Sequence, residues 1–268
     1  MKNNKILLIN DDGINSPGLL AAVQVGIEFG DVIVAAPSTQ QTAMGRSLKG
    51  NRNALLQPID YEVYGKKIEA YQCECSPALL VRHSLAVLFP FEKPDLIISG
   101  INYGENIGAT ITSSGTVGAA LEGATFGIPS IAISKETDIE SHHNYTKQDW
   151  TGTQYFLRYF VKRMLMEKLP FDVDVLKVDV PDTADSSTPW EITKQAKTPY
   201  YSTVFKNPSL KSRLGDGKTA IDLDSESLET GTDIHAIYVD RTVSVTPISI
   251  SLTSRVDFQE LNNLLKRT

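Results

Sequence analysis

Short apolar runs that alternate with helical patterns constrain the fold of this 268-residue chain more than any other feature. The runs at 5–10 (KILLIN), 31–37 (DVIVAAP) and 94–100 (PDLIISG) have the length and composition of buried strands. Stretches with apolar residues at helical spacing lie between and after them, as at 148–168. Strands that alternate with helices predict parallel βαβ units. We therefore expect an α/β fold with a mostly parallel sheet.

The chain length is near the upper limit of what one hydrophobic core supports. We expect a single domain over residues 1–268, with a core of about 1–181 and a C-terminal segment of about 182–268. The polar stretch 182–232 is too long for an ordinary connection. It is a lid, an arm that reaches a partner subunit, or a poorly ordered segment. The sequence then predicts strands at 234–240 and 243–250 and a terminal helix from Val256.

Composition excludes several classes of partner. The net charge is −6 without a long Lys/Arg block, which argues against binding of a nucleic-acid polymer. No apolar run approaches the roughly 20 residues that span a bilayer, and the N-terminus lacks a signal-peptide pattern, so we expect a cytoplasmic protein without membrane contact. Cys73 and Cys75 fit neither a disulfide framework nor a zinc site and are expected to be ordinary thiols.

Oxygen-bearing side chains follow three of the predicted strands. Asp11 and Asp12 follow the first, Ser38, Thr39 and Thr42 follow the second, and Asn102 follows the third. The carboxyl ends of parallel strands form one crevice, so these groups should meet there. Adjacent carboxylates resist joint ionisation unless a positive charge lies between them. Carboxylate, hydroxyl and amide oxygens suit Mg²⁺, Mn²⁺ or Ca²⁺, and the sequence therefore predicts a divalent cation.

The stretch TSSGTVG predicts an anion site. Ser113, Ser114 and Thr116 surround Gly115 directly before a predicted helix. The free N–H groups at a helix start favour phosphate. Glu122 lies further along this helix, where we expect a solvated or packing role.

Several features have plainer interpretations. Ser76 and Pro77 are predicted to cap and open a helix. Asp12 or Asn10 could serve only as a turn residue before the helix. The histidines, including the adjacent pair, lack acidic partners at metal-binding spacing and are not expected to bind metal. Asn144 and Tyr145 are not assigned to a nucleoside pocket. The histidines are His83, His142, His143 and His235.

Two other functions remain open. An Asp pair after the first strand also occurs in receiver domains of phosphorelay proteins, which need a third Asp at a strand end. Asp60 is at a suitable distance, but no apolar strand precedes it, and the chain is about twice as long as a receiver. A non-catalytic nucleotide binder on the same scaffold is the other alternative.

Four motifs in order, NDDGINSPG, APSTQQTAMGRSL, SGINYGENIG and SGTVGAALEGATFGIPSIAIS, resemble the SurE family of metal-dependent nucleotide phosphatases. Later stretches such as LKVDVP and GTDIHAIYVDRTVSVTPISISLT extend the resemblance over nearly the whole chain. It implies a Rossmann-like three-layer core with a C-terminal β-hairpin or arm and a terminal helix. It also implies a homodimer or homotetramer in which a C-terminal arm is exchanged between subunits. We place this arm, and part of the active-site rim, at 197–232.

The resemblance further implies hydrolysis of nucleoside 5′-monophosphates, with 3′-monophosphates and short polyphosphate as additional substrates. One divalent cation per subunit, Mg²⁺ or Mn²⁺, would be held by Asp11, Asp12, Thr42 and Asn102. Thr42 stands where the family normally has serine, and CSPALLV stands where it more often has Gly-Thr-Pro. The predicted catalytic residues are Asp12 and Asp11, and the predicted phosphate-binding residues are Asn102, Ser113, Ser114, Gly115 and Thr116.

Overall fold

The computed structural model describes residues 3–142 and 144–266. The helices are α1 (Pro17–Gly26), α2 (Pro77–Val87), α3 (Gly115–Thr125), α4 (Thr151–Met166), α5 (Asp233–His235) and α6 (Phe258–Leu265), with short helical turns η1 (Ala109–Ser113), η2 (Ile139–His142), η3 (Leu214–Asp216), η4 (Ser225–Ser227) and η5 (Ala236–Asp240). The strands are β1 (Asn4–Ile9), β2 (Gly30–Pro37), β3 (Gln57–Pro58), β4 (Glu62–Val63), β5 (Lys66–Lys67), β6 (Glu69–Cys73), β7 (Leu96–Tyr103), β8 (Ser130–Lys135), β9 (Val175–Val180), β10 (Trp190–Ile192), β11 (Tyr201–Val204), β12 (Lys218–Ile221) and β13 (Val243–Ile248).

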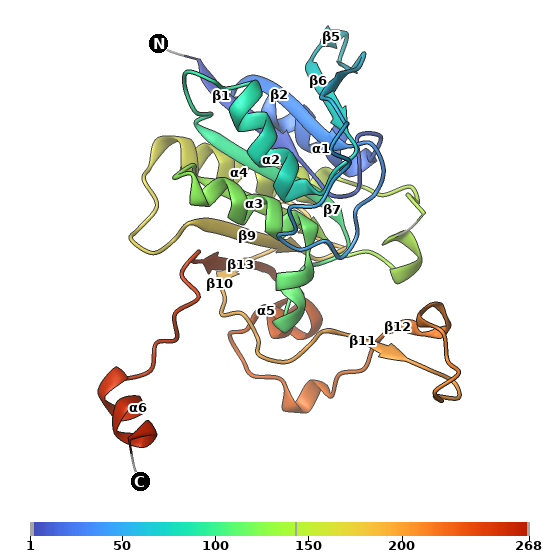
Figure 1. Cartoon of the computed structure of the whole chain (residues 1–268), viewed down its shortest axis with the longest axis vertical. Coiled ribbons are helices and arrows are strands. Elements are labelled where there is room, and N and C mark those ends of the chain that lie inside the picture. Colours follow the sequence, from blue (N-terminus) through green and yellow to red (C-terminus); the bar gives the residue numbers. More distant parts are fainter. Residues whose placement is uncertain (1–2, 143, 267–268) are drawn as a thin grey trace.

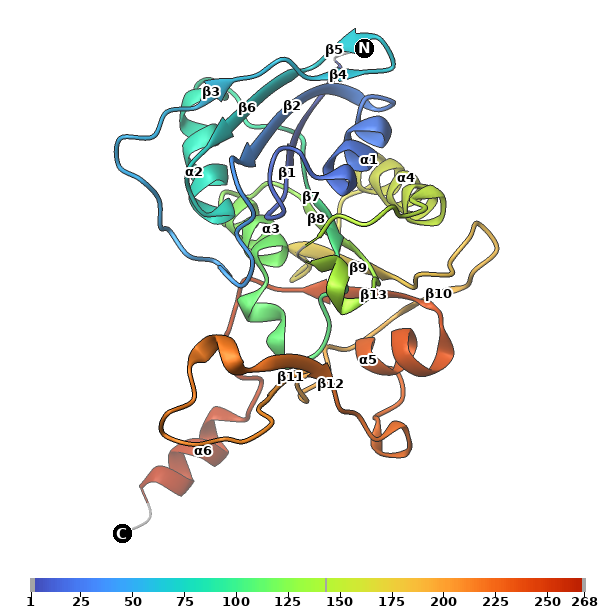
Figure 2. The same ribbon diagram turned by 90° about the vertical axis from the view of Figure 1, so that its right-hand side faces the viewer.

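A nine-stranded sheet forms the centre of the molecule, in the order β10-β13-β9-β8-β7-β1-β2-β6-β3 (Figures 1 and 2). Neighbouring strands run parallel except β13 beside β9 and β3 beside β6. The predicted α/β fold with a mostly parallel sheet is confirmed.

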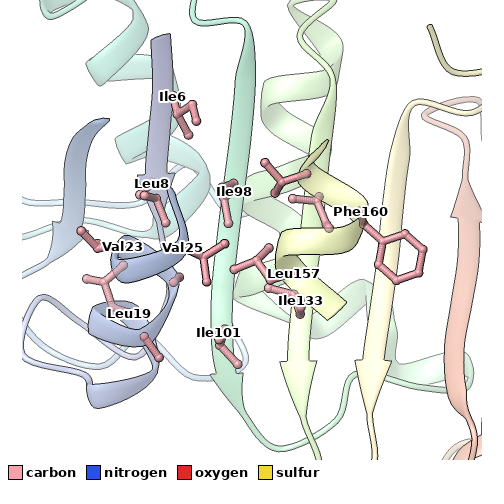
Figure 3. Close-up of a cluster of buried hydrophobic side chains, with 14 of the residues drawn as sticks. Ile6, Leu8, Leu19, Val23, Val25, Ile98, Ile101, Ile133, Leu157 and Phe160 are labelled. Carbon is pink, nitrogen blue, oxygen red and sulfur yellow. The ribbon is translucent and has the colours of Figure 1, made fainter. Parts of the chain in front are cut away.

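Helices cover both faces of the sheet and make three layers. Ile6 and Leu8 of β1 face α1 and α4, where Leu157 belongs to the same cluster (Figure 3). Leu7 and Ile9 point to the other face, toward α2 and α3. Successive side chains of a strand alternate between faces, so a strand covered on both sides is apolar throughout. Burying one such side chain contributes about 2 kcal/mol to folding.

The C-terminal segment contains both core strands and a projecting part. β10 and β13 extend the main sheet beyond residue 181. β11 and β12 form a separate antiparallel hairpin, in which Tyr201 pairs with Ile221. Both the hairpin and the tail that carries α6 extend away from the sheet (Figures 1 and 2). The predicted hairpin and terminal helix are confirmed, and the helix begins at Phe258 rather than Val256.

The prediction of a strand at 234–240 is wrong, because this stretch forms α5 and η5. The Thr232 hydroxyl accepts a hydrogen bond from the His235 N–H and so caps the first turn. Ile234, Ala236 and Ile237 are buried. The apolar pattern of these residues is typical of a strand, but the capped turn places their side chains together on the buried face of a short helix.

Two further features concern helices. Ser76 precedes Pro77 at the start of α2, as predicted, but its hydroxyl does not cap the helix. It donates instead to the Ser47 carbonyl at 2.5 Å and accepts from the Lys49 N–H at 3.2 Å, because the 47–49 loop crosses the helix start. Within the described part of the chain, the helices are too short or too polar to cross a membrane.

Candidate active site

A cavity of about 350 Å³ opens at the carboxyl ends of β1, β2 and β7. The loops that follow these strands supply one wall, and the β11–β12 hairpin supplies another. The lining residues predicted from the sequence are Asp11, Asp12, Thr42, Asn102, Ser113 and Ser114. The structure therefore brings both acids, the threonine hydroxyl and the asparagine amide to one space, as the strand-end argument predicted. Ser38 and Thr39, which were expected to face the same crevice, are not among the residues that line the cavity.

Asp11 and Asp12 are buried, with exposed fractions of 7% and 4%. Burial raises the pKa of Asp11 above its usual range. Burial and the neighbouring charge of Asp11 together raise the pKa of Asp12 well above its usual range. Among the described residues that line the cavity there is no lysine or arginine to offset these charges.

The two carboxylates are held by different partners. Asp12 accepts hydrogen bonds from the Tyr103 backbone N–H at 3.2 Å and from the Gln40 amide at 3.1 Å. Asp11 accepts from the Thr116 hydroxyl. These hydrogen bonds fix the orientation of both carboxylates just beyond the carboxyl end of β1.

Asn102 lies at the end of β7, which extends three residues beyond the predicted strand end at Gly100. Its amide nitrogen donates to the Gly104 carbonyl at 2.6 Å, which fixes the orientation of the side chain. The amide oxygen lies 3.1 Å from the Thr116 hydroxyl and is thereby placed beside Asp11. An oxygen fixed next to two carboxylates is a suitable cation ligand.

The start of α3 packs directly against Asp11. A Cβ added to Gly115 would lie 2.7 Å from an Asp11 carboxylate oxygen, so only glycine permits this approach. The backbone N–H groups of Thr116 and Gly115 lower the pKa of Asp11, although burial outweighs them. Ser114 caps α3 through the Val117 N–H at 3.1 Å, and the Ser113 hydroxyl donates to the Thr110 carbonyl at 2.7 Å. Of the predicted phosphate-binding stretch, Ser113 and Ser114 thus border the cavity, whereas Gly115 and Thr116 are not in its lining and contact Asp11 instead.

Several cavity residues were not predicted. Gln40 bridges Asp12 and the His142 carbonyl, which lies 2.6 Å from its amide nitrogen. Glu105 and His142 also line the cavity, together with Tyr201 from the hairpin. Gln40 and Glu105 are close in sequence to predicted ligands, which is the only signal that could have found them. Tyr201 is 96 residues after Glu105 and 161 after Gln40, and local patterns cannot locate it.

Glu122 is buried rather than solvated, with an exposed fraction of 1%. It accepts from Arg46 at 2.7 Å and from Arg82 at 2.6 Å. Its packing role is confirmed, whereas the solvated alternative is wrong, because this face of α3 is covered by α2 and by the 38–50 loop.

The remaining residues weighed from the sequence have the following positions. Cys73 and Cys75 are buried free thiols, as predicted. His83 is exposed, and His235 lies 2.8 Å from the Asp240 carboxylate. His143 lies outside the described residues. The Tyr145 hydroxyl donates to the Asp12 carbonyl, which places it beside the acids.

Comparison with known proteins decides the family. The family model described as "Survival protein SurE" matches residues 6–202. The chain belongs to the SurE family. A protein named 5′-nucleotidase SurE from Thermococcus gammatolerans is 40% identical to it over 262 residues, which cover 97% of this chain and 96% of the relative. A second of the same name, from Methanothrix thermoacetophila, is 34% identical over 273 residues and 98% of each chain.

A solved SurE structure supports the same assignment. The crystal structure of the SurE protein from Aquifex aeolicus superposes with a TM-score of 0.79 at 30% identity, covering 98% of this chain and all of that one. The three-layer fold described above is therefore the SurE fold, including its C-terminal part. The family resemblance seen in the sequence motifs is confirmed.

Proposed function

We propose that this SurE protein is a divalent-metal-dependent phosphatase that hydrolyses nucleoside 5′-monophosphates to nucleoside and phosphate. The observation that supports it most directly is the buried pair Asp11 and Asp12 in a cavity that opens between strand ends. The relatives named 5′-nucleotidase SurE match along nearly the whole chain, which supports the choice of substrate.

The donor set fits one cation. Two carboxylates, the Asn102 amide oxygen and the Thr42 hydroxyl are all hard oxygen ligands, which Mg²⁺ and Mn²⁺ prefer. Among the described residues, no group of three His, Cys, Asp or Glu side chains could hold a metal. The site therefore needs the amide and the hydroxyl to complete its ligands. A bound divalent cation supplies Lewis acidity to the phosphoryl oxygens and lowers the pKa of bound water.

The protein groups have separate tasks in this proposal. Asp12 accepts a proton from the attacking water, because its carboxylate lines the cavity and is held there by the Gln40 amide and the Tyr103 backbone N–H. Asp11 is fixed by Thr116 and the start of α3 and holds the cation in place. Phosphoryl transfer demands donors around the equatorial oxygens. The Ser114 hydroxyl borders the cavity and, because it accepts the cap hydrogen bond, keeps its own proton to donate, whereas Ser113 would first have to release the Thr110 carbonyl.

Phosphate release from AMP tests the function, with EDTA, Mg²⁺ or Mn²⁺ added. We expect turnover only with metal and a loss of at least about a hundredfold in kcat for Asp12→Asn. Asp60→Asn is the matched control, since Asp60 is exposed and lies outside the cavity lining. Near wild-type turnover by Asp12→Asn would refute the assignment. A stable phosphoprotein that Asp60→Asn abolishes would favour the receiver alternative, and binding without release would favour the nucleotide binder.

The finer properties belong to the same proposal. Nucleoside 3′-monophosphates and short polyphosphate are further substrates to include in the assay. Thr42 keeps the hydroxyl of the usual serine but adds a methyl group on a stiff side chain, so metal preference is expected to differ from relatives with serine. We also propose a cytoplasmic homodimer or homotetramer assembled through the C-terminal arm.

A further inference from the structure

The walls of the cavity come from two parts of the chain, the sheet core and the β11–β12 hairpin. The core supplies Asp11 and Asp12 at the strand ends, and the hairpin supplies Tyr201, Thr203 and Thr219. A phosphate bound beside the acids through the proposed cation leaves its ester group facing other parts of the cavity. The hairpin is therefore one wall that can distinguish one phosphate ester from another.

Glu105 connects these two walls. It lies three residues after Asn102, is 3% exposed, and accepts a hydrogen bond from the Tyr201 hydroxyl at 2.6 Å. The adjacent Tyr200 hydroxyl also interacts with this carboxyl group. Main-chain contacts lie nearby as well: the Ala109 N–H donates to the Thr198 carbonyl at 2.9 Å, Gly108 pairs with Pro199, and Tyr201 itself pairs with Ile221 of β12. The hydrogen bond to Glu105 is the contact that ties the Tyr201 side chain to the core beside Asn102.

Tyr201 presents an aromatic surface to the cavity. Its ring packs edge to face with His142 at a centroid distance of 5.7 Å, so one side is braced by a core loop. Stacking of a nucleobase on an aromatic side chain changes binding roughly tenfold to hundredfold. A ring held in place by a buried hydrogen bond binds such a group better than a mobile one, because less ordering is needed on binding.

We propose that Glu105 is a positioning residue that makes the site selective for phosphate esters of nucleosides, by holding Tyr201 as the surface against which the nucleoside lies. This inference depends on the proposed phosphatase function. It concerns the nucleoside portion of the substrate and leaves the roles of the acids unchanged.

The experiment compares AMP with glycerol 2-phosphate, a small ester without an aromatic group. Glu105→Leu removes the acceptor of the Tyr201 hydrogen bond, and Glu105→Gln keeps an acceptor oxygen. We expect the ratio of kcat/KM for AMP to that for glycerol 2-phosphate to fall at least tenfold in Glu105→Leu, through KM for AMP. Glu105→Gln should restore most of the ratio. Glu140→Leu, at an exposed glutamate of η2, is the matched control and should keep the wild-type ratio.

A double-mutant cycle separates this role from a general structural one. Tyr201→Phe should lower the ratio in the same direction, and its effect should largely vanish in the Glu105→Leu background, because the two residues act through one contact. An unchanged ratio in Glu105→Leu, or additive effects of the two substitutions, would overturn the proposal. If the wild-type protein hydrolysed neither ester, the phosphatase function itself would fail instead.

Discussion

Glu105 is a buried carboxyl group whose ionisation has a measurable cost. Burial raises its pKa from 4.5 to about 7, and the Tyr201 hydroxyl only partly opposes this. The folded protein therefore keeps the Glu105 proton at a pH where the unfolded chain has lost it. Stability must then fall as the pH rises from about 4.5 to about 7, and level off above that.

The resulting prediction concerns the metal-free protein in EDTA. The contribution of Glu105 to the free energy of unfolding should be about 3 kcal/mol smaller at pH 8 than at pH 4.5. Glu105→Gln lacks the ionisation and should lose less stability over this range. Urea unfolding of both proteins at pH 5, 6, 7 and 8 measures the difference. Parallel pH profiles would contradict the raised pKa, since Asp11 and Asp12 titrate in both proteins and cancel.

Among single residues, the sequence predicted the positions of those that directly follow the carboxyl end of a predicted strand. Asp11, Asp12 and Asn102 leave parallel strands at the same edge of the sheet, so their meeting follows from topology. Gln40 and Tyr201 could not be found in this way, because their positions depend on a loop path and on a hairpin that folds back. Single side-chain contacts between distant segments leave no periodic pattern.

Among the elements, α3 is a docking surface for the loop that carries Thr42. Gly118 faces the Gly45 backbone so closely that an added Cβ would lie 2.2 Å from the Gly45 carbonyl oxygen. The Gly45 N–H donates to the Ser113 carbonyl at 2.8 Å. Arg46 then reaches Glu122 on the same helix. The position of Thr42 in the cavity thus depends on small residues of α3.

Gly118→Ala should therefore displace this loop. We expect a loss of about 1–3 kcal/mol in unfolding free energy from overpacking. The Mn²⁺ concentration for half-maximal activity should rise about tenfold, because Thr42 moves away from the other proposed ligands. Isothermal titration with Mn²⁺ checks the second effect without turnover. Gly215→Ala is the control, since nothing lies within 4 Å of its added Cβ; equal effects of both substitutions would contradict the docking role.

Element types were predictable where one periodicity dominated. The strand β1 and the helix α4 followed from their apolar spacing. The prediction of a strand at 234–240 was wrong because the apolar pattern of a short segment fits a strand and a packed helical turn equally well. The hydrogen bond that caps the turn at Thr232 favours the helical turn over the strand. Such a hydrogen bond is visible only in the folded structure, once the residues around Thr232 have been placed.

For the whole molecule, the tail after β13 is a part whose apolar side chains a single chain leaves uncovered. Phe258, Leu261 and Leu264 of α6 are exposed, at 65%, 39% and 60%. A helix of eight residues is too short to be stable alone in water. Its apolar side chains therefore require a partner surface, which adds α6 to the arm at 197–232 as a second C-terminal segment for the proposed assembly.

Disruption of this surface should change the oligomeric state. The intact chain is expected to behave as two or four chains in light scattering coupled to size exclusion. Leu261→Asp combined with Leu264→Asp should shift the protein toward the monomer, because charges oppose burial of the helix. Asn262→Asp combined with Asn263→Asp adds the same charge to the same helix and should leave the oligomer intact. A monomeric wild-type protein would refute the assembly.

The division of the cavity between core and hairpin has a consequence for how the family can diverge. Substitutions in β11 and β12 alter the wall beside Tyr201 without contacting Asp11 or Asp12, which are fixed by β7 and α3. Selection on substrate range can then act on the short β11–β12 hairpin while Asp11, Asp12 and the residues that hold them change little. New specificities could be reached by exchanging hairpins between relatives, as modules, with the chemistry inherited unchanged.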